Sequence, residues 1–154
     1  MRKWLKHLKN QKGLTLIELL AVVVILGIIA AIAVPAIGNI IDDSKDDAHR
    51  SNSLLIINAA KLGIVSGEVT PTMLEDNNIT LNELVAAGVL DGIPADPSLD
   101  GKTYSPGSSF VTYTPTNTSA KYVITLKSVS SPSKFYFNKA VSETELNEGA
   151  DPTP

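Results

Sequence analysis

An uncharged apolar run dominates the first third of the chain. Between Glu18 and Asp42 there is no charged residue, which leaves 41 − 18 = 23 positions, and only Asn39 among them is strongly polar. A helix needs roughly 20 apolar residues to cross a ~30 Å hydrocarbon core. The run therefore predicts a membrane-spanning helix. Glu18 stands at its start, where an acid either lies at the level of the lipid headgroups or has a function that requires a partner.

The apolar periodicity continues past the predicted span. The pattern predicts one helix from about Thr15 to Ser66, with Gly67 as its C-terminal cap. We expect residues 14–41 to lie in lipid and residues 42–67 to form an amphipathic half that packs on a soluble domain. Pro35 should kink the helix. The predicted packing stripe has members three to four positions apart: Ile37, Ile40 or Ile41, Ser44, Ala48, Ser51, Leu55, Ala59, Leu62 and Val65 or Ser66.

Residues 68–146 predict a small globular head. The segment Thr80-Leu81-Asn82-Glu83 fits a capping box for a short helix at 81–87, which Gly88 would end. β-Branched and aromatic runs at 110–113, 121–127 and 134–138 then predict three or four antiparallel strands. Residues 147–154 lack apolar content, so we expect a flexible tail. The predicted fold class is α+β, with a long N-terminal helix packed on a small C-terminal antiparallel sheet.

The run at 121–127 also predicts which side chains face the core, because successive residues of a strand point to opposite faces. Tyr122, Ile124 and Leu126 should face the long helix. The alternate positions should be mostly exposed: Lys121, Val123, Thr125 and Lys127.

Charge is divided unevenly along the chain. The first 13 residues hold 5 of the 13 Lys and Arg, while all 16 acids come later, so the rest of the chain carries 8 − 16 = −8. This asymmetry predicts that the leader lies in the cytoplasm and the head outside. An acidic head is a poor partner for nucleic acid, whose binding depends on cations. Because no cysteine is present, disulfides, thiol chemistry, zinc ribbons and Fe–S clusters are excluded.

The segment Lys12-Gly13-Leu14-Thr15-Leu16-Ile17-Glu18 resembles the class III signal of type IV prepilins, and the resemblance covers about residues 9 to 40. In that family a prepilin peptidase cleaves after the Gly, the new N-terminal residue is methylated, and a Glu stands five residues into the mature chain. Gly13, Leu14 and Glu18 fall on those positions. Leu14 replaces the usual Phe. The resemblance therefore implies a leader at 1–13, cleavage after Gly13 and N-methylation of Leu14.

The same resemblance implies a type IV pilin fold and a major-pilin role. The chain would be a single-pass membrane protein, then a homopolymer in an extracellular pilus for adhesion, motility or surface interaction. Its partners would be the membrane, the prepilin peptidase and, indirectly, an assembly ATPase and a platform protein. In assembly, Glu18 would pair with the Leu14 amine of a neighbour, and the stretch from Gly27 to Pro35 would lose helical regularity. The lack of cysteine departs from many Gram-negative pilins and favours a Gram-positive type.

Two other functions remain open from the sequence. One is a pseudopilin of a type II secretion or competence DNA-uptake system. The other is a monomeric, membrane-anchored binding module, which would have no need for Glu18. Gene neighbourhood, subunit abundance and filament length would separate these alternatives.

Enzymatic and cofactor chemistry have little support. His49, the one histidine after the leader, is expected on a solvated helix surface among charged residues. No Ser/His/Asp set or phosphate-binding loop can be assembled, and we expect no cofactor. Asp91, Asp96 and Asp100 lie in a Pro/Gly-rich loop and offer the oxygen ligands that Ca²⁺ prefers. Pseudopilins hold Ca²⁺ in a loop that this segment faintly resembles, although solvated turn acids explain the same residues.

Overall fold

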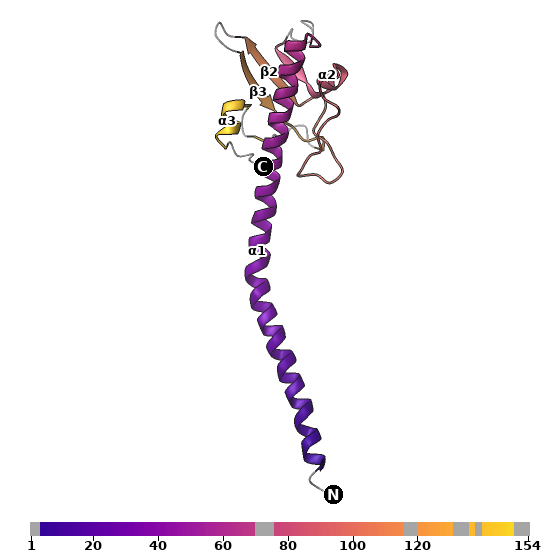
Figure 1. The fold of residues 1–154 in the computed structure, drawn as a ribbon, viewed down its shortest axis with the longest axis vertical. Helices are drawn as coiled ribbons and strands as arrows, with labels where there is room; N and C mark the ends of the chain where they lie inside the picture. Colours follow the sequence, from indigo (N-terminus) through magenta and orange to yellow (C-terminus); the bar gives the residue numbers. More distant parts are fainter. Residues whose placement is uncertain (1–3, 70–75, 116–119, 131–135, 138–139, 150–154) are drawn as a thin grey trace. The chain divides into compact units, whose positions relative to one another are not determined.

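The computed structural model describes residues 4–69, 76–115, 120–130, 136–137 and 140–149, with side chains from residue 16 onward except Ala120. The chain divides into two compact units, one ending at Asp43 and one beginning at Ser44. Figure 1 shows the elements: helices α1 (Trp4–Ser66), α2 (Leu81–Ala86) and α3 (Glu143–Asn147), and strands β1 (Asn78–Thr80), β2 (Phe110–Pro115), β3 (Ala120–Thr125) and β4 (Val141–Ser142).

Helix α1 is longer than predicted, because it begins at Trp4 rather than near Thr15. The segment from Trp4 to Lys12 contains no Gly or Pro, and Leu, Lys and Gln have good helix propensity. In the first unit the side chains from Leu16 onward are exposed, apart from a half-buried Ala33. The helix runs through Pro35 without a break in its assignment.

The C-terminal end of α1 confirms the predicted cap. Gly67 has a φ of 77°, in the left-handed region that glycine adopts without strain. Its backbone N–H donates to the Ile64 carbonyl at 3.3 Å. One turn earlier, Gly63 allows a close approach: a Cβ added there would lie 2.5 Å from a methyl of Val69. The chain therefore leaves the helix tightly packed against its last turn.

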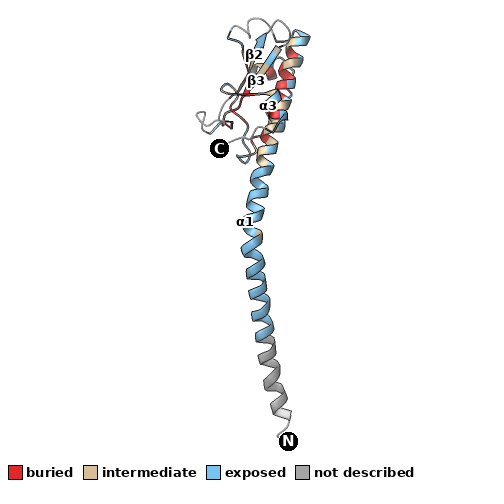
Figure 2. Ribbon diagram, turned by 90° about the vertical axis from the view of Figure 1, so that its left-hand side faces the viewer, coloured by how far each residue is buried: buried red, intermediate tan, exposed pale blue. Residues whose placement is uncertain are grey.

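The second half of α1 packs on the sheet through a different face from the one predicted. Ser53, Ile56, Ile57 and Ala60 are buried. Figure 2 shows that the buried part of α1 lies toward its C-terminal end. Most of the predicted stripe is instead exposed, including Leu55, Leu62 and Val65, and only Ala59 of that set is buried. The prediction was wrong because two apolar faces share the same helical period. The face that meets the head carries buried isoleucine and alanine residues, with a half-buried Leu54 beside them.

The sheet has four antiparallel strands in the order β1-β2-β3-β4, so neighbours in space are neighbours in sequence. Val111 of β2 and Val141 of β4 are the register partners of Ile124 on either side. All three side chains are buried with α1's Ile56 and Ile57 in one apolar cluster. A long helix packed on an antiparallel sheet confirms the predicted α+β fold.

Two of the three predicted strand runs are confirmed. Strand β2 contains the run at 110–113, and β3 contains residues 121–125 of the run predicted at 121–127. Of the run at 134–138, Tyr136 and Phe137 form a buried bend rather than a strand, and the other three positions lie outside the described residues. Strands β1 and β4 were not predicted, because they have only 3 and 2 residues and show no alternation.

The predicted faces of β3 are right for the core side and partly wrong for the other. Ile124 and Leu126 are buried and Tyr122 packs against the cluster, as predicted. Lys121 is exposed, but Thr125 is only 7 % exposed, so both faces of the strand are covered at its end.

Helix α2 confirms the predicted capping box. The Thr80 hydroxyl accepts from the Glu83 N–H at 3.3 Å, and the Glu83 carboxylate accepts from the Thr80 N–H at 2.7 Å. The helix ends at Ala86, and Gly88 follows with a φ of 70°. The backbone N–H groups of Thr80 and Glu83 each donate to the other residue's side chain. These two hydrogen bonds stabilise the first turn and allow so short a helix to form.

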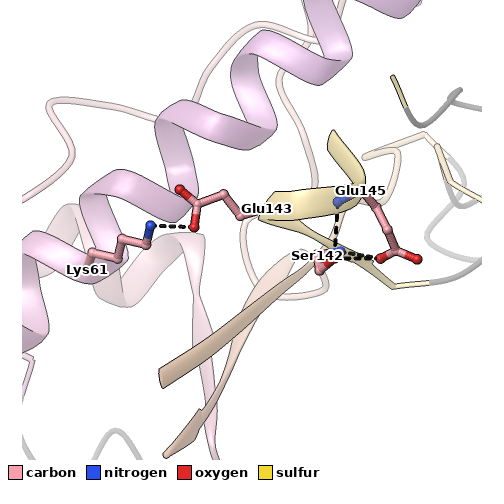
Figure 3. A network of polar contacts seen from close by, with 4 residues as sticks. All are labelled: Lys61, Ser142, Glu143 and Glu145. Atoms are coloured by element: carbon pink, nitrogen blue, oxygen red, sulfur yellow. Dashed lines mark hydrogen bonds and ion pairs between the residues drawn. The ribbon is translucent and has the colours of Figure 1, made fainter. Parts of the chain in front are cut away.

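Helix α3 was not predicted, although Ser142 and Glu145 form the same kind of box. Figure 3 shows this box beside an ion pair that joins α3 to α1, in which the Lys61 ammonium and the Glu143 carboxylate are 2.5 Å apart. Asn147, the first position of the predicted tail, is the last residue of the helix, and positions 150–154 of that tail lie outside the described residues. The Lys61 and Glu143 side chains are still partly open to solvent, so the ion pair contributes about 1 kcal/mol or less.

Candidate functional site

The exposed apolar part of α1 is the first candidate site. Sixteen large apolar side chains between Leu16 and Ile41 are 49 to 72 % exposed. Part of α1 is long and apolar enough to cross a membrane, judged by length and composition. Glu18 is the only charged residue between Leu16 and Ile41, and its side chain is exposed. A carboxylate at the start of such a surface needs an opposite charge or a hydrogen-bond donor.

The residues around Glu18 are arranged by helical geometry. Residues 13 and 14 lie in the α1 backbone, but the side chain of Leu14 is outside the described residues. Leu14 and Glu18 are four positions apart, which is about one turn and a rise of ~6 Å. A cation created at the Leu14 nitrogen would therefore lie one turn from the carboxylate along the helix axis.

Gly27 lies on open surface, because a Cβ added there would meet nothing within 4 Å. In the described part of the chain, a larger side chain at this position would therefore cause no steric clash. Gly27 and Ala31 are one turn apart, a spacing of small residues that allows another helix to approach closely in lipid. Pro35 lies two turns from Gly27 and removes one backbone donor.

Comparison with known families supports the interpretation of this segment. Residues 8–34 match the profile of the prokaryotic N-terminal methylation motif. In this segment the chain is similar to type IV pilin-like and pseudopilin-like proteins. Neither the curated proteins nor the solved structures include a match to it. The motif implies processing by a prepilin peptidase and a membrane-anchored precursor.

The head of this pilin-like chain contains a buried polar cluster that the sequence did not predict. His49 is 1 % exposed, so its predicted place on a solvated surface was wrong. Its Nδ1 lies 2.7 Å from the Tyr104 hydroxyl and its Nε2 lies 2.9 Å from the Ser98 hydroxyl. The Tyr136 ring stacks on the imidazole, with centroids 4.1 Å apart. The cluster thus joins α1 to two segments that are distant in sequence.

Asp96 belongs to the same cluster, and not to a group of acids. It is 4 % exposed, and its carboxylate accepts hydrogen bonds from the Ser98 N–H and from the Tyr136 hydroxyl. Asp91 and Asp100 are exposed. Across the described residues no three His, Asp or Glu side chains gather in a way that suits a metal. The structure therefore gives Asp96 a structural role in the loop and does not bring the three calcium candidates together.

The stability of the head should depend on pH in the alkaline range, because burial raises the pKa of two tyrosines in the cluster. Burial, followed by the hydrogen bond to Asp96, raises the pKa of Tyr136 to about 12 from an ordinary value of 10.0, and burial also raises the pKa of Tyr104. A raised pKa means that the folded head favours the neutral phenol. The resulting stability is complete below pH 10 and is lost as pH rises through about 12.

We therefore expect the melting temperature of the full chain in detergent to fall steeply between about pH 10 and 12. Tyr136→Phe should melt lower at pH 8, because Asp96 loses a donor, and should show a shallower fall across this window. Tyr113→Phe, on the half-buried face of β2, is the matched control and should keep the steep fall. Equal slopes for both variants would show that Tyr136 does not cause the steep fall.

Proposed function

We propose that this chain is the major structural subunit of a type IV pilus. It is inserted in the membrane as a precursor, cleaved after Gly13, methylated at the Leu14 nitrogen, and polymerised through α1 into an extracellular filament. The observation that carries the proposal is the methylation motif at residues 8–34 on a helix whose large apolar side chains are exposed from Leu16 to Ile41. A helix that leaves the lipid with this surface must be covered by other helices.

The roles of individual residues follow from that environment. The new amine at Leu14 and the carboxylate of Glu18 would both be costly to leave unpaired among apolar helices. We assign them to each other across neighbouring subunits. Gly27 and Pro35 mark the stretch that would lose regularity during assembly, since Pro35 lacks one backbone donor and a Cβ added at Gly27 would meet nothing within 4 Å in the described part of the chain.

Such a subunit needs partners but no cofactor of its own. A prepilin peptidase removes the leader, and an assembly ATPase with its platform protein would extract subunits from the membrane. The filament would then serve adhesion, motility or surface contact. A pseudopilin has the same anchor and processing, so filament length and subunit abundance separate the two roles: a major pilin forms long surface filaments.

Cleavage between Gly13 and Leu14 is the first expected result. Mass spectrometry of protein sheared from the cell surface should find an N-terminal peptide that begins at Leu14 and carries one methyl group on its nitrogen. Gly13→Ala keeps a small residue and should be processed more slowly, whereas Gly13→Leu should block cleavage and retain the precursor in the membrane. Sheared protein that still contains Met1 or Arg2 would contradict the proposal.

A further inference from the structure

The outward face of α1 in the head carries apolar side chains that are exposed in the described part of the chain. Outside Leu16–Ile41, four large apolar residues are exposed among those described, and three of them belong to α1: Leu55, Leu62 and Val65, at 51, 58 and 84 %. Single exposed leucines are ordinary on protein surfaces. Three on one helix, next to a groove, are typical of an interaction site.

A groove lies beside this face. Leu55, Asn58, Ala59 and Leu62 form one wall, and residues 89–92 form the other, around a volume of about 500 Å³. The second wall is held in place by backbone hydrogen bonds, since the N–H groups of Val89 and Leu90 both donate to the Leu84 carbonyl at 3.2 Å. Leu55 and Leu62 are two helical turns apart, about 10 Å, which is the width of one helix with its side chains.

Charge restricts what can occupy the groove. At about 100° per residue, Ala48, Ser51, Ala59, Leu62 and Ser66 lie within about 40° of Leu55 around the helix, and none is charged. In the second unit the charged residues of α1 lie about 80° or more from Leu55 around the helix: Lys45, Asp46, Asp47, Arg50 and Lys61. Asp91 is the one charged residue among those that line the groove. Elsewhere the surface is acidic, because residues 14–154 carry 8 − 16 = −8, so like copies repel each other.

We propose that this groove takes the apolar span, Leu19–Ile41, of a second copy of the chain. The span is uncharged over its whole length, is helical, and is exposed in a single copy. It therefore matches the groove in charge, in apolar character and in width, whereas another acidic head does not. The inference rests on the proposed function and specifies which surface of the head contacts the helical core of the filament.

Photo-crosslinking in assembled filaments tests this contact without assuming a register. The photoreactive amino acid p-benzoylphenylalanine replaces Leu62, and in a matched control it replaces Val129, which is 39 % exposed and outside the groove. After irradiation, a product of twice the subunit mass is digested with trypsin. The span gives one recognisable peptide, Leu14–Lys45, because no Lys or Arg lies between these residues.

The expected result is a crosslink from position 62 to the Leu14–Lys45 peptide, absent or at least roughly tenfold weaker from position 129. Crosslinks from position 62 only to head peptides, only to lipid, or no more often than the control would overturn the inference. Filaments must form for the test to start, and an unsubstituted chain that forms none would refute the proposed function and the inference with it. Normal filaments with a different crosslink would refute the inference alone.

A charge placed in the groove gives an independent test. Leu62→Glu should melt close to the unsubstituted chain, because the side chain is already 58 % exposed. Its filament yield should fall by roughly tenfold or more, since the new carboxylate would be buried without a partner. Val129→Glu should assemble normally. Normal yield for Leu62→Glu would contradict the inference.

Discussion

Glu18→Ala is expected to leave membrane insertion and leader cleavage intact and to reduce filament number by roughly tenfold or more. The proposed cleavage after Gly13 would create an amine at Leu14 that is cationic below about pH 8. Packed among apolar helices, this amine and the Glu18 carboxylate would stabilise each other, and leaving either unpaired would cost several kcal/mol. The pair would therefore set the axial register of each new subunit, because apolar surfaces alone tolerate sliding.

Two further variants separate charge from size at this position. Glu18→Gln keeps the shape and a hydrogen-bond acceptor but removes the charge, so it should assemble nearly as poorly as Glu18→Ala. Glu18→Asp keeps the charge on a shorter arm and should be intermediate. Imaging of cells in which each variant is the sole copy gives filament number and length, and mass spectrometry of the membrane pool confirms cleavage. Normal filaments from Glu18→Ala would refute the assigned role.

The second large effect is expected in the head, where Ile124→Ala should lower the free energy of unfolding by roughly 2–5 kcal/mol. Ile124 is fully buried, and its register partners Val111 and Val141 are buried on either side. Removing its three outer carbons leaves a cavity that the paired strands cannot close easily. Denaturant unfolding of the full chain in detergent, followed by circular dichroism, measures the loss.

Lys121→Ala is the matched control, because Lys121 lies on the same strand with an exposed side chain. Its cost should be within about 0.5 kcal/mol. Thr125→Ala should fall between the two, since Thr125 is 7 % exposed rather than open to solvent. Similar losses for Ile124→Ala and Lys121→Ala would mean that the strand faces are assigned incorrectly.

Local signals in the sequence predicted the fold well. The Thr80 and Glu83 pair marked the start of α2, and Gly67 and Gly88 marked helix ends, because caps depend on neighbouring residues alone. The span could be predicted from its length and lack of charge. Ser142 and Glu145 carried an equally clear signal for α3, which a search for a second capping box would have found.

Features that depend on distant contacts could not be predicted in this way. Which apolar face of α1 meets the sheet is decided by the shape of the head, and both faces have the same period. His49 is buried because Tyr104, 55 positions later, and Tyr136 lie around it. A single histidine among charged residues gives no hint of such partners. Of the candidate assembly residues, the structure shows that Glu18 is exposed and Gly27 unobstructed, while their roles stay predictions.

The distribution of core residues along the chain has a consequence for how the head is made. The core residues on α1 are synthesised early. Four others are synthesised near the end of the chain and are buried in the same cluster: Tyr136, Phe137, Val141 and Leu146. Contacts between such distant segments form slowly, because a long loop must close first. Until these residues have been synthesised, the head has an incomplete core and an unpaired edge on β3. Truncation before Val141 should leave the chain in that state, open to proteases, however normal its anchor.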